Sequence, residues 1–160
     1  MTLDPHDRLS IAAFVRQEGR GVVATVAPQG GPEAALVGLA SLDDGTLVFN
    51  AARQARKIDN LATNDLVAIV VGVAGEVSVQ LEGTAVIARE QERERYGDEY
   101  ERQLPGSRAR DPEFAVVVVR PSWVRVYDTS TRPATVLEAR WSSRGLLILA
   151  ETTPAPHRVR

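Results

Sequence analysis

The sequence predicts a mainly β protein, built from six or seven antiparallel strands with a few flanking helices. Short segments rich in valine, isoleucine, leucine and alanine recur along the chain, and one of them, residues 76–88, alternates apolar and polar residues with a period of two. Clusters of turn residues such as Pro-Gln-Gly-Gly and Asp-Asp-Gly separate these segments. Such strands leave edges exposed unless the sheet closes on itself. We therefore expect an antiparallel barrel, and the pattern alone also fits a sandwich.

The first third of the chain is expected to hold one helix and a three-stranded meander. Asp4 followed by Pro5 is typical of a helix start, and apolar residues at helical spacing continue until Gly19. Two apolar segments then flank a turn, and a third follows a second turn. The predicted helix covers residues 5–18, and the predicted strands cover residues 21–27, 33–42 and 46–50.

The middle of the chain is expected to hold a short helix and two strands. Ile58 and Leu61 recur at helical spacing and form one apolar stripe over residues 53–63. Two strands follow, the second with clear period-two alternation, and Gly83 within it predicts a bulge or a close approach of another segment. These strands are expected at residues 66–73 and 76–88.

The remainder begins with a highly charged segment, residues 89–104, which predicts a solvated helix over the barrel mouth. A loop and a strand pair follow, and we expect Pro121 to interrupt that pair because proline cannot donate to a ladder. The loop covers 105–112, the pair 114–119 and 123–127, and two further strands are possible at 136–141 and 145–150. We expect one domain, residues 1–150, and a frayed tail, residues 151–160.

Composition excludes several classes of function. The formal net charge is −2 and the arginines are scattered, so no nucleic-acid role is expected. The chain has no cysteine, and its two histidines, His6 and His157, lie in terminal segments, so neither a metal site nor a serine hydrolase triad is expected. The longest apolar run is too short to span a membrane, and the polar N-terminal segment is unlike a signal peptide. A cytoplasmic protein is the expectation.

Three basic residues cluster at the start of the second predicted helix: Arg53, Arg56 and Lys57, the last being the only lysine among 19 basic residues. Cations at a helix N-terminus are unfavourable, because the helix dipole and free N–H groups already make that end positive. A bound phosphate would relieve this repulsion. The placement therefore predicts an anion site, and solvated arginines on a short helix are the alternative.

Six segments of the chain follow one another in a characteristic order and spacing. They are Val23-Ala24-Thr25-Val26 through Gly30, Ala35-Leu36-Val37-Gly38, Asp44-Gly45-Thr46-Leu47-Val48-Phe49-Asn50, Arg56-Lys57-Ile58-Asp59-Asn60-Leu61, Gln80-Leu81-Glu82-Gly83-Thr84-Ala85 and Val119-Arg120-Pro121-Ser122-Trp123. Together these segments resemble the FMN-binding core of the pyridoxamine-phosphate-oxidase-like split barrels. The likeness covers about residues 20–90 and extends to residues 119–128.

The resemblance implies a split barrel that binds FMN as a homodimer, with cofactor sites at the subunit interface. Arg56 and Lys57 match the basic pair that grips the flavin phosphate. The other implied cofactor contacts are Leu36, Val37 and Gly38 along the isoalloxazine, Asn50 and Ala51 near the ring and ribityl chain, and Gln80 and Trp123 reaching the partner's flavin. Without the resemblance, a tryptophan between β-branched residues is more often core or interface.

The implied activity is that of an FMN-dependent oxidoreductase acting on a small molecule that the sequence does not identify. The isoalloxazine carries the electrons, so no catalytic side chain needs to stand out. The tail lacks a match to the arginine- and histidine-rich substrate segment of authentic pyridoxamine phosphate oxidases, so that activity is not expected. Two alternatives remain open: a deazaflavin-dependent reductase on the same barrel, suggested by an arginine-rich, lysine-poor composition, and a non-catalytic flavin-binding or stress-related protein.

Overall fold

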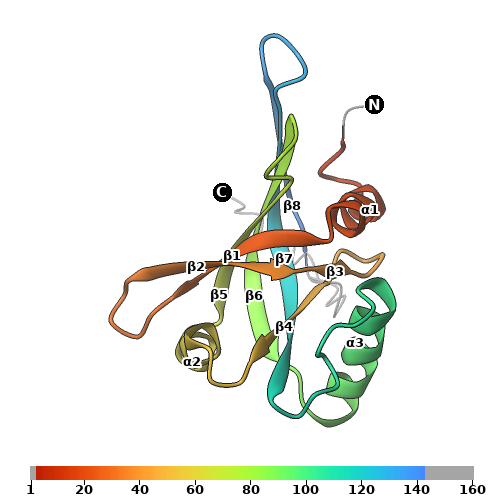
Figure 1. Cartoon of the computed structure of the whole chain (residues 1–160). Helices are drawn as coiled ribbons and strands as arrows, with labels where there is room; N and C mark the ends of the chain where they lie inside the picture. The colour runs from red at the N-terminus through yellow and green to blue at the C-terminus, as the bar shows by residue number, and fades with distance from the viewer. Residues whose placement is uncertain (1–2, 143–160) are drawn as a thin grey trace, which may run out of the picture.

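The computed structural model describes residues 3–142 and shows a strongly curled antiparallel sheet with three helices packed on it (Figure 1). Neighbouring strands follow the order β2-β1-β5-β6-β7-β4-β3, and β8 pairs with β7 beside this path. The helices are α1 (Arg8–Glu18), α2 (Arg56–Thr63) and α3 (Glu90–Gln103). The strands are β1 (Arg20–Val26), β2 (Pro32–Gly38), β3 (Ala40–Ser41), β4 (Leu47–Ala52), β5 (Leu66–Val71), β6 (Val77–Ile87), β7 (Phe114–Asp128) and β8 (Thr135–Arg140).

The two ends of the sheet are joined by the chain itself. β2 ends at Gly38 and β3 begins at Ala40, so Leu39 alone carries the backbone from one edge strand to the other. Within residues 3–142 no ladder of backbone hydrogen bonds joins β2 to β3 or β4. The sheet is therefore a split barrel rather than a barrel closed by hydrogen bonds, as the resemblance implied and the strand pattern alone did not distinguish.

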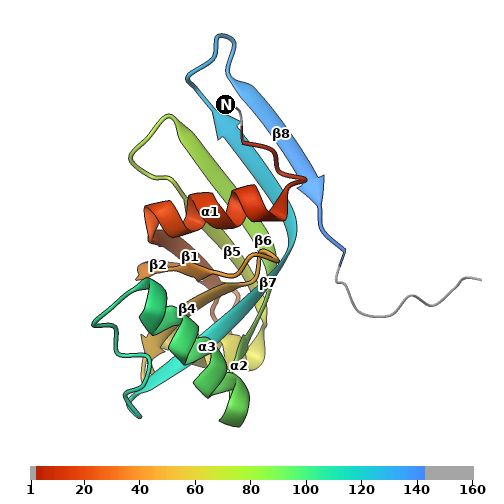
Figure 2. The same cartoon turned by 90° about the vertical axis from the view of Figure 1, so that its right-hand side faces the viewer.

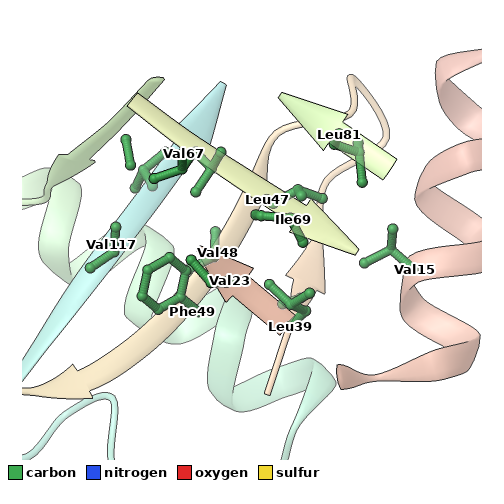
Figure 3. Packing of buried hydrophobic residues seen from close by; sticks show 14 of the residues in the cluster. Val15, Val23, Leu39, Leu47, Val48, Phe49, Val67, Ile69, Leu81 and Val117 are labelled. Atoms are coloured by element: carbon green, nitrogen blue, oxygen red, sulfur yellow. The ribbon is translucent and has the colours of Figure 1, made fainter. Parts of the chain in front are cut away.

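The hydrophobic core fills the concave side of the curl. Side chains from five strands point toward one another there, and Val15 of α1 closes one end (Figure 3). Figure 2 shows α1 and α3 at separate places on the curled sheet. α3 covers the outer surface of β4 and β7, and the first part of β7, from Ala115 to Val119, is therefore buried on both faces. The labelled core residues in Figure 3 are Val15, Val23, Leu39, Leu47, Val48, Phe49, Val67, Ile69, Leu81 and Val117.

The expected interruption at Pro121 is wrong, because β7 runs unbroken from Phe114 to Asp128. On one side of β7, pairing with β4 ends at Val119 and pairing with β8 begins at Trp123, so Pro121 lies between two partners where no donor is needed. On the other side, the register with β6 shifts between Glu82 and Gly83. The irregularity predicted at Gly83 is thus confirmed, and its extra residue is Ser122 of β7. The close approach offered as the alternative is also present, because a Cβ atom on Gly83 would approach Cα of Pro121 to 2.7 Å.

Two predicted helices begin later than expected. The side chain of Asp7, rather than that of Asp4, accepts hydrogen bonds from the N–H groups of Leu9 and Ser10, so α1 begins at Arg8. The second helix begins at Arg56 rather than Arg53. The predicted strand at 136–141 is confirmed as β8 within one residue, whereas the expected strand at 145–150 and the tail at 151–160 lie outside the described residues.

Candidate functional site

A pocket of about 410 Å³ lies between the start of α2 and the β1–β2 hairpin. α2 packs beside this hairpin, as Figure 1 shows. One wall is cationic, from the first two residues of α2, and the other is formed by small apolar side chains with one carboxylate. The lining residues are Val23, Thr25, Glu33, Ala34, Ala35, Arg56 and Lys57.

The first turn of α2 carries two adjacent cations, Arg56 and Lys57, together with Asp59. Its N-cap residue is Ala55, whose methyl side chain offers no oxygen to the first N–H groups of the helix. Arg56 is exposed and Lys57 is half-buried, and both line the pocket. Arg53 lies before the helix and donates from Nε to the Pro112 carbonyl oxygen at 2.7 Å. Two of the three clustered cations thus meet at the pocket, and the third does not.

A polar bridge attaches α2 to the hairpin, and two of its three residues, Thr25 and Glu33, line this pocket. Thr25 and Glu33 are partners across β1 and β2. The Nδ2 of Asn60, on α2, donates to Thr25 Oγ1 and to Glu33 Oε2, both at 2.9 Å. Thr25 and Asn60 are 3% and 2% exposed, so the bridge is buried. The other oxygen of Glu33 is ion-paired with Arg56.

The sequence reasoning missed Thr25, Glu33 and Asn60 as site residues. One signal was present: Val23 lies on the concave face of β1, and Thr25, two residues later, puts a hydroxyl on that same face. A buried hydroxyl needs a partner, and the chain supplies one from a helix 35 residues away. That partner becomes visible only when α2 is packed against β1.

Three other expected cofactor residues lie on the outward face of the sheet. Leu36 pairs with Val22, and Val22 and Gln80 both pair with Val70, so Leu36 and Gln80 lie in one row across four strands. Residues paired in this way share a face of the sheet. Trp123 pairs with Glu82 and therefore faces outward beside Gln80. Leu36 is 60% exposed.

The remaining expected contacts are divided between the interior and the seam of the barrel. Val37 packs against the core cluster, and Ala51 is buried within it, so neither side chain faces outward with Leu36. Gly38 and Asn50 lie beside Tyr100 of α3. Burial raises the pKa of the Tyr100 phenol, and a hydrogen bond from the Asn50 backbone opposes that rise.

A family model described as pyridoxamine 5'-phosphate oxidase matches residues 10–128. The chain belongs to this family. The match spans every strand from β1 to β7, including the pocket at α2, so the pyridoxamine 5'-phosphate oxidase family assignment covers the candidate site. A search of curated proteins finds no match.

Three solved structures of similar fold come from bacterial proteins with different descriptions. An FMN-binding protein related to pyridoxamine 5'-phosphate oxidase from Nostoc punctiforme is 16% identical, with 87% of each chain covered and a TM-score of 0.60. General Stress Protein 26 of Bacillus anthracis is 20% identical, with 82% of this chain and 96% of that chain covered and a TM-score of 0.59. A heme binding protein of Mycobacterium smegmatis is 21% identical, with 81% and 57% covered and a TM-score of 0.65.

Residues 3–142 contain neither a group of side chains placed to bind a metal nor a helix able to span a membrane. No three histidine, aspartate or glutamate side chains in this part of the chain are placed to hold a metal ion. None of the three helices described there is long and apolar enough to cross a membrane.

Proposed function

We propose that the chain binds FMN, with the flavin phosphate held at the start of α2. The observation that carries this proposal is the pocket in which two adjacent cations and an uncapped helix N-terminus face one volume. A phosphate needs several N–H donors and positive charge, and this end of α2 offers both. The residues present therefore fit the phosphate end of a flavin.

The chain's own residues would divide the work of binding. Arg56 offers a planar set of donors and Lys57 a point charge, so together they fix the position of a phosphate. Ala34, Ala35 and Val23 give a small-residue wall against which a ribityl chain or ring edge could lie. The bound flavin would supply electron transfer, and the proposed activity is that of an oxidoreductase whose substrate is a small molecule not yet assigned.

We further propose that the working unit is a homodimer. Its support is the outward face of the sheet, where large apolar side chains are exposed beside Gln80 and Trp123. Leu36, Leu66 and Val70 are 60%, 57% and 37% exposed. A second copy covering this face would bury them and bring its own Gln80 and Trp123 to the flavin.

The test is an absorbance spectrum of the purified protein, taken before and after incubation with FMN and removal of the unbound fraction. Wild-type protein should retain oxidised-flavin bands. The Arg56→Ala/Lys57→Ala variant should lose them, because the phosphate loses both of its cationic partners. The matched control is Arg53→Ala/Arg89→Ala, which removes the same charge from two exposed positions outside the pocket.

Each outcome separates the candidate functions. A flavin retained by wild type and by the control, and lost only by the pocket variant, supports the proposal. A colourless wild-type protein that takes up no FMN contradicts it and favours the deazaflavin coenzyme, which can be offered in the same assay. A flavin-bound protein that no electron donor or acceptor can cycle would be a carrier rather than an oxidoreductase.

A further inference from the structure

Glu33 places a negative charge inside a pocket that is otherwise suited to an anion. Its carboxylate is ion-paired with Arg56, one of the two cations that line the pocket. The side chain of Glu33 is 20% exposed, whereas that of Arg56 is 77% exposed. The acidic partner is therefore the fixed member of this pair, and the guanidinium is the free one.

The buried bridge explains why Glu33 stays in place. Asn60 Nδ2 holds the second carboxylate oxygen at 2.9 Å, and Asn60 itself is 2% exposed. Turning Glu33 out of the pocket would leave a buried amide with one acceptor fewer. A phosphate bound at the start of α2 would therefore lie close to a carboxylate that is held in place by Asn60.

We propose that Glu33 is an internal competitor for the ligand phosphate, which must take Arg56 from Glu33 in order to bind. This inference rests on the proposed function and assigns a specificity-determining residue to the same site. With Glu33 charged, the three ionised side chains of the pocket sum to +1, from two cations and one anion. Without it they sum to +2, which matches the roughly two negative charges of a phosphate monoester at neutral pH.

The experiment compares wild type with Glu33→Gln in titrations with FMN and with riboflavin, which lacks the phosphate, followed by flavin fluorescence. Glutamine keeps an oxygen that can accept from Asn60 Nδ2 while removing the charge. We expect Glu33→Gln to bind FMN roughly tenfold more tightly than wild type does, a gain of about 1.4 kcal/mol in binding free energy. Its affinity for riboflavin should equal that of wild type. Asp65→Asn, an exposed aspartate outside the pocket lining, is the control for net charge and should behave as wild type.

A double-mutant cycle with Arg56→Ala tests whether Glu33 acts through Arg56. In the Arg56→Ala background, Glu33→Gln should give a gain clearly smaller than tenfold, because no guanidinium is left to compete for. An equal gain in both backgrounds, or an equal gain for riboflavin, overturns the proposal. If Glu33→Gln is unstable by thermal unfolding, Glu33→Ala is the second variant. Glu33→Ala leaves Asn60 Nδ2 with Thr25 Oγ1 as its acceptor. This variant must also bind FMN more tightly than wild type does.

Inorganic phosphate separates failure of this inference from failure of the proposed function. If wild type binds no flavin, the proposed FMN binding is wrong. The competition between Glu33 and phosphate for Arg56 is then tested by measuring the Tm of each protein with and without inorganic phosphate. A larger phosphate-induced rise in Tm for Glu33→Gln than for wild type and Asp65→Asn supports the competition. An equal rise, or none in any of the three proteins, overturns it.

Discussion

Tyr100 of α3 lies against Gly38 of β2 so closely that a Cβ atom built on Gly38 would approach the Tyr100 hydroxyl oxygen to 2.6 Å. The same Cβ atom would lie 3.2 Å from Cδ1 of Leu104. The contact sits where β2 ends and the chain crosses to β3, so it fixes α3 at the seam of the split barrel. The absence of a side chain at Gly38 is what allows the tyrosine to be buried there.

Replacing Gly38 by alanine is therefore expected to destabilise the protein by roughly 1–3 kcal/mol, because the added methyl overpacks the seam. Tyr100→Phe in the same chain should recover part of this loss, since it removes the atom that the methyl meets first. Gly31→Ala is the control, because a Cβ built there has no heavy atom within 4 Å. Urea unfolding measures all four proteins, and equal losses for Gly38→Ala and Gly31→Ala would contradict the close contact.

Tyr100 should also make stability depend on alkaline pH. Burial raises the pKa of its phenol above 10.0, so the unfolded chain loses this proton at a lower pH than the folded chain does. The stabilisation is fully present below the unfolded pKa and declines as pH rises through the folded pKa. Wild type should lose free energy of unfolding above about pH 10 more steeply than Tyr100→Phe. Parallel pH profiles for the two proteins would show that the phenol is not responsible.

Gly83 is expected to tolerate no side chain. A Cβ atom there would clash with the carbonyl oxygen of Arg120 and approach Cα of Pro121 to 2.7 Å. Both are backbone atoms at the bulge, so relief requires movement of β7 itself. We expect Gly83→Ala to cost about 3 kcal/mol or more in chemical unfolding. Gly75→Ala, whose nearest atom would be 4.0 Å away, should stay within about 0.5 kcal/mol of wild type, and a similar loss for both would count against the bulge.

The outward face provides a prediction about assembly. Glutamate at Leu36 would place a charge in the centre of the exposed apolar row and oppose association of two copies. Wild type should elute with twice the 17.4 kDa chain mass in light-scattering chromatography, and Leu36→Glu with the mass of one chain. Val136→Glu, at another exposed apolar position on β8, tests whether the dimer needs the Leu36 row in particular. A monomeric wild type at micromolar concentration would overturn the homodimer.

Local sequence patterns were enough for most of the fold. Apolar segments and turn residues, with period-two alternation in β6, placed β1, β4, β5 and β6 within a few residues of their observed bounds. The predicted strand at 33–42 and its meander with 46–50 are wrong, because the chain leaves one edge of the sheet at Leu39 and continues as β3 at the other edge. The interruption expected at Pro121 was wrong because a proline breaks a strand only where its missing N–H group is needed by a neighbouring strand. Which strands pair beside Pro121 is decided by the whole sheet and not by the local sequence. The cap expected at Asp4 was wrong because Asp7, three residues later, is an equally good cap and has the two N–H groups within reach.

The candidate site was predictable only in part, for a similar reason. Arg56 and Lys57 are adjacent in sequence and share one helix end, so local reasoning placed them in one pocket. Glu33 lies 23 residues from Arg56, and its pairing depends on how α2 packs on the hairpin. Nothing in a strand sequence marks one glutamate as facing a helix rather than solvent.

Leu39 restrains how the two edges of the barrel can move relative to each other. It is the single residue between the two edge strands, it is 1% exposed, and its N–H donates to the Gly19 carbonyl oxygen at 3.0 Å. The edges on either side of it cannot drift apart, because one residue spans less than about 4 Å of chain. Any breathing of the barrel at this seam must therefore be a rotation about a buried pivot, with the far ends of β2 and β4 moving most. The far end of β2 is where Glu33 meets Arg56. Thermal opening of the seam would therefore also change the distance between these two side chains in the anion pocket.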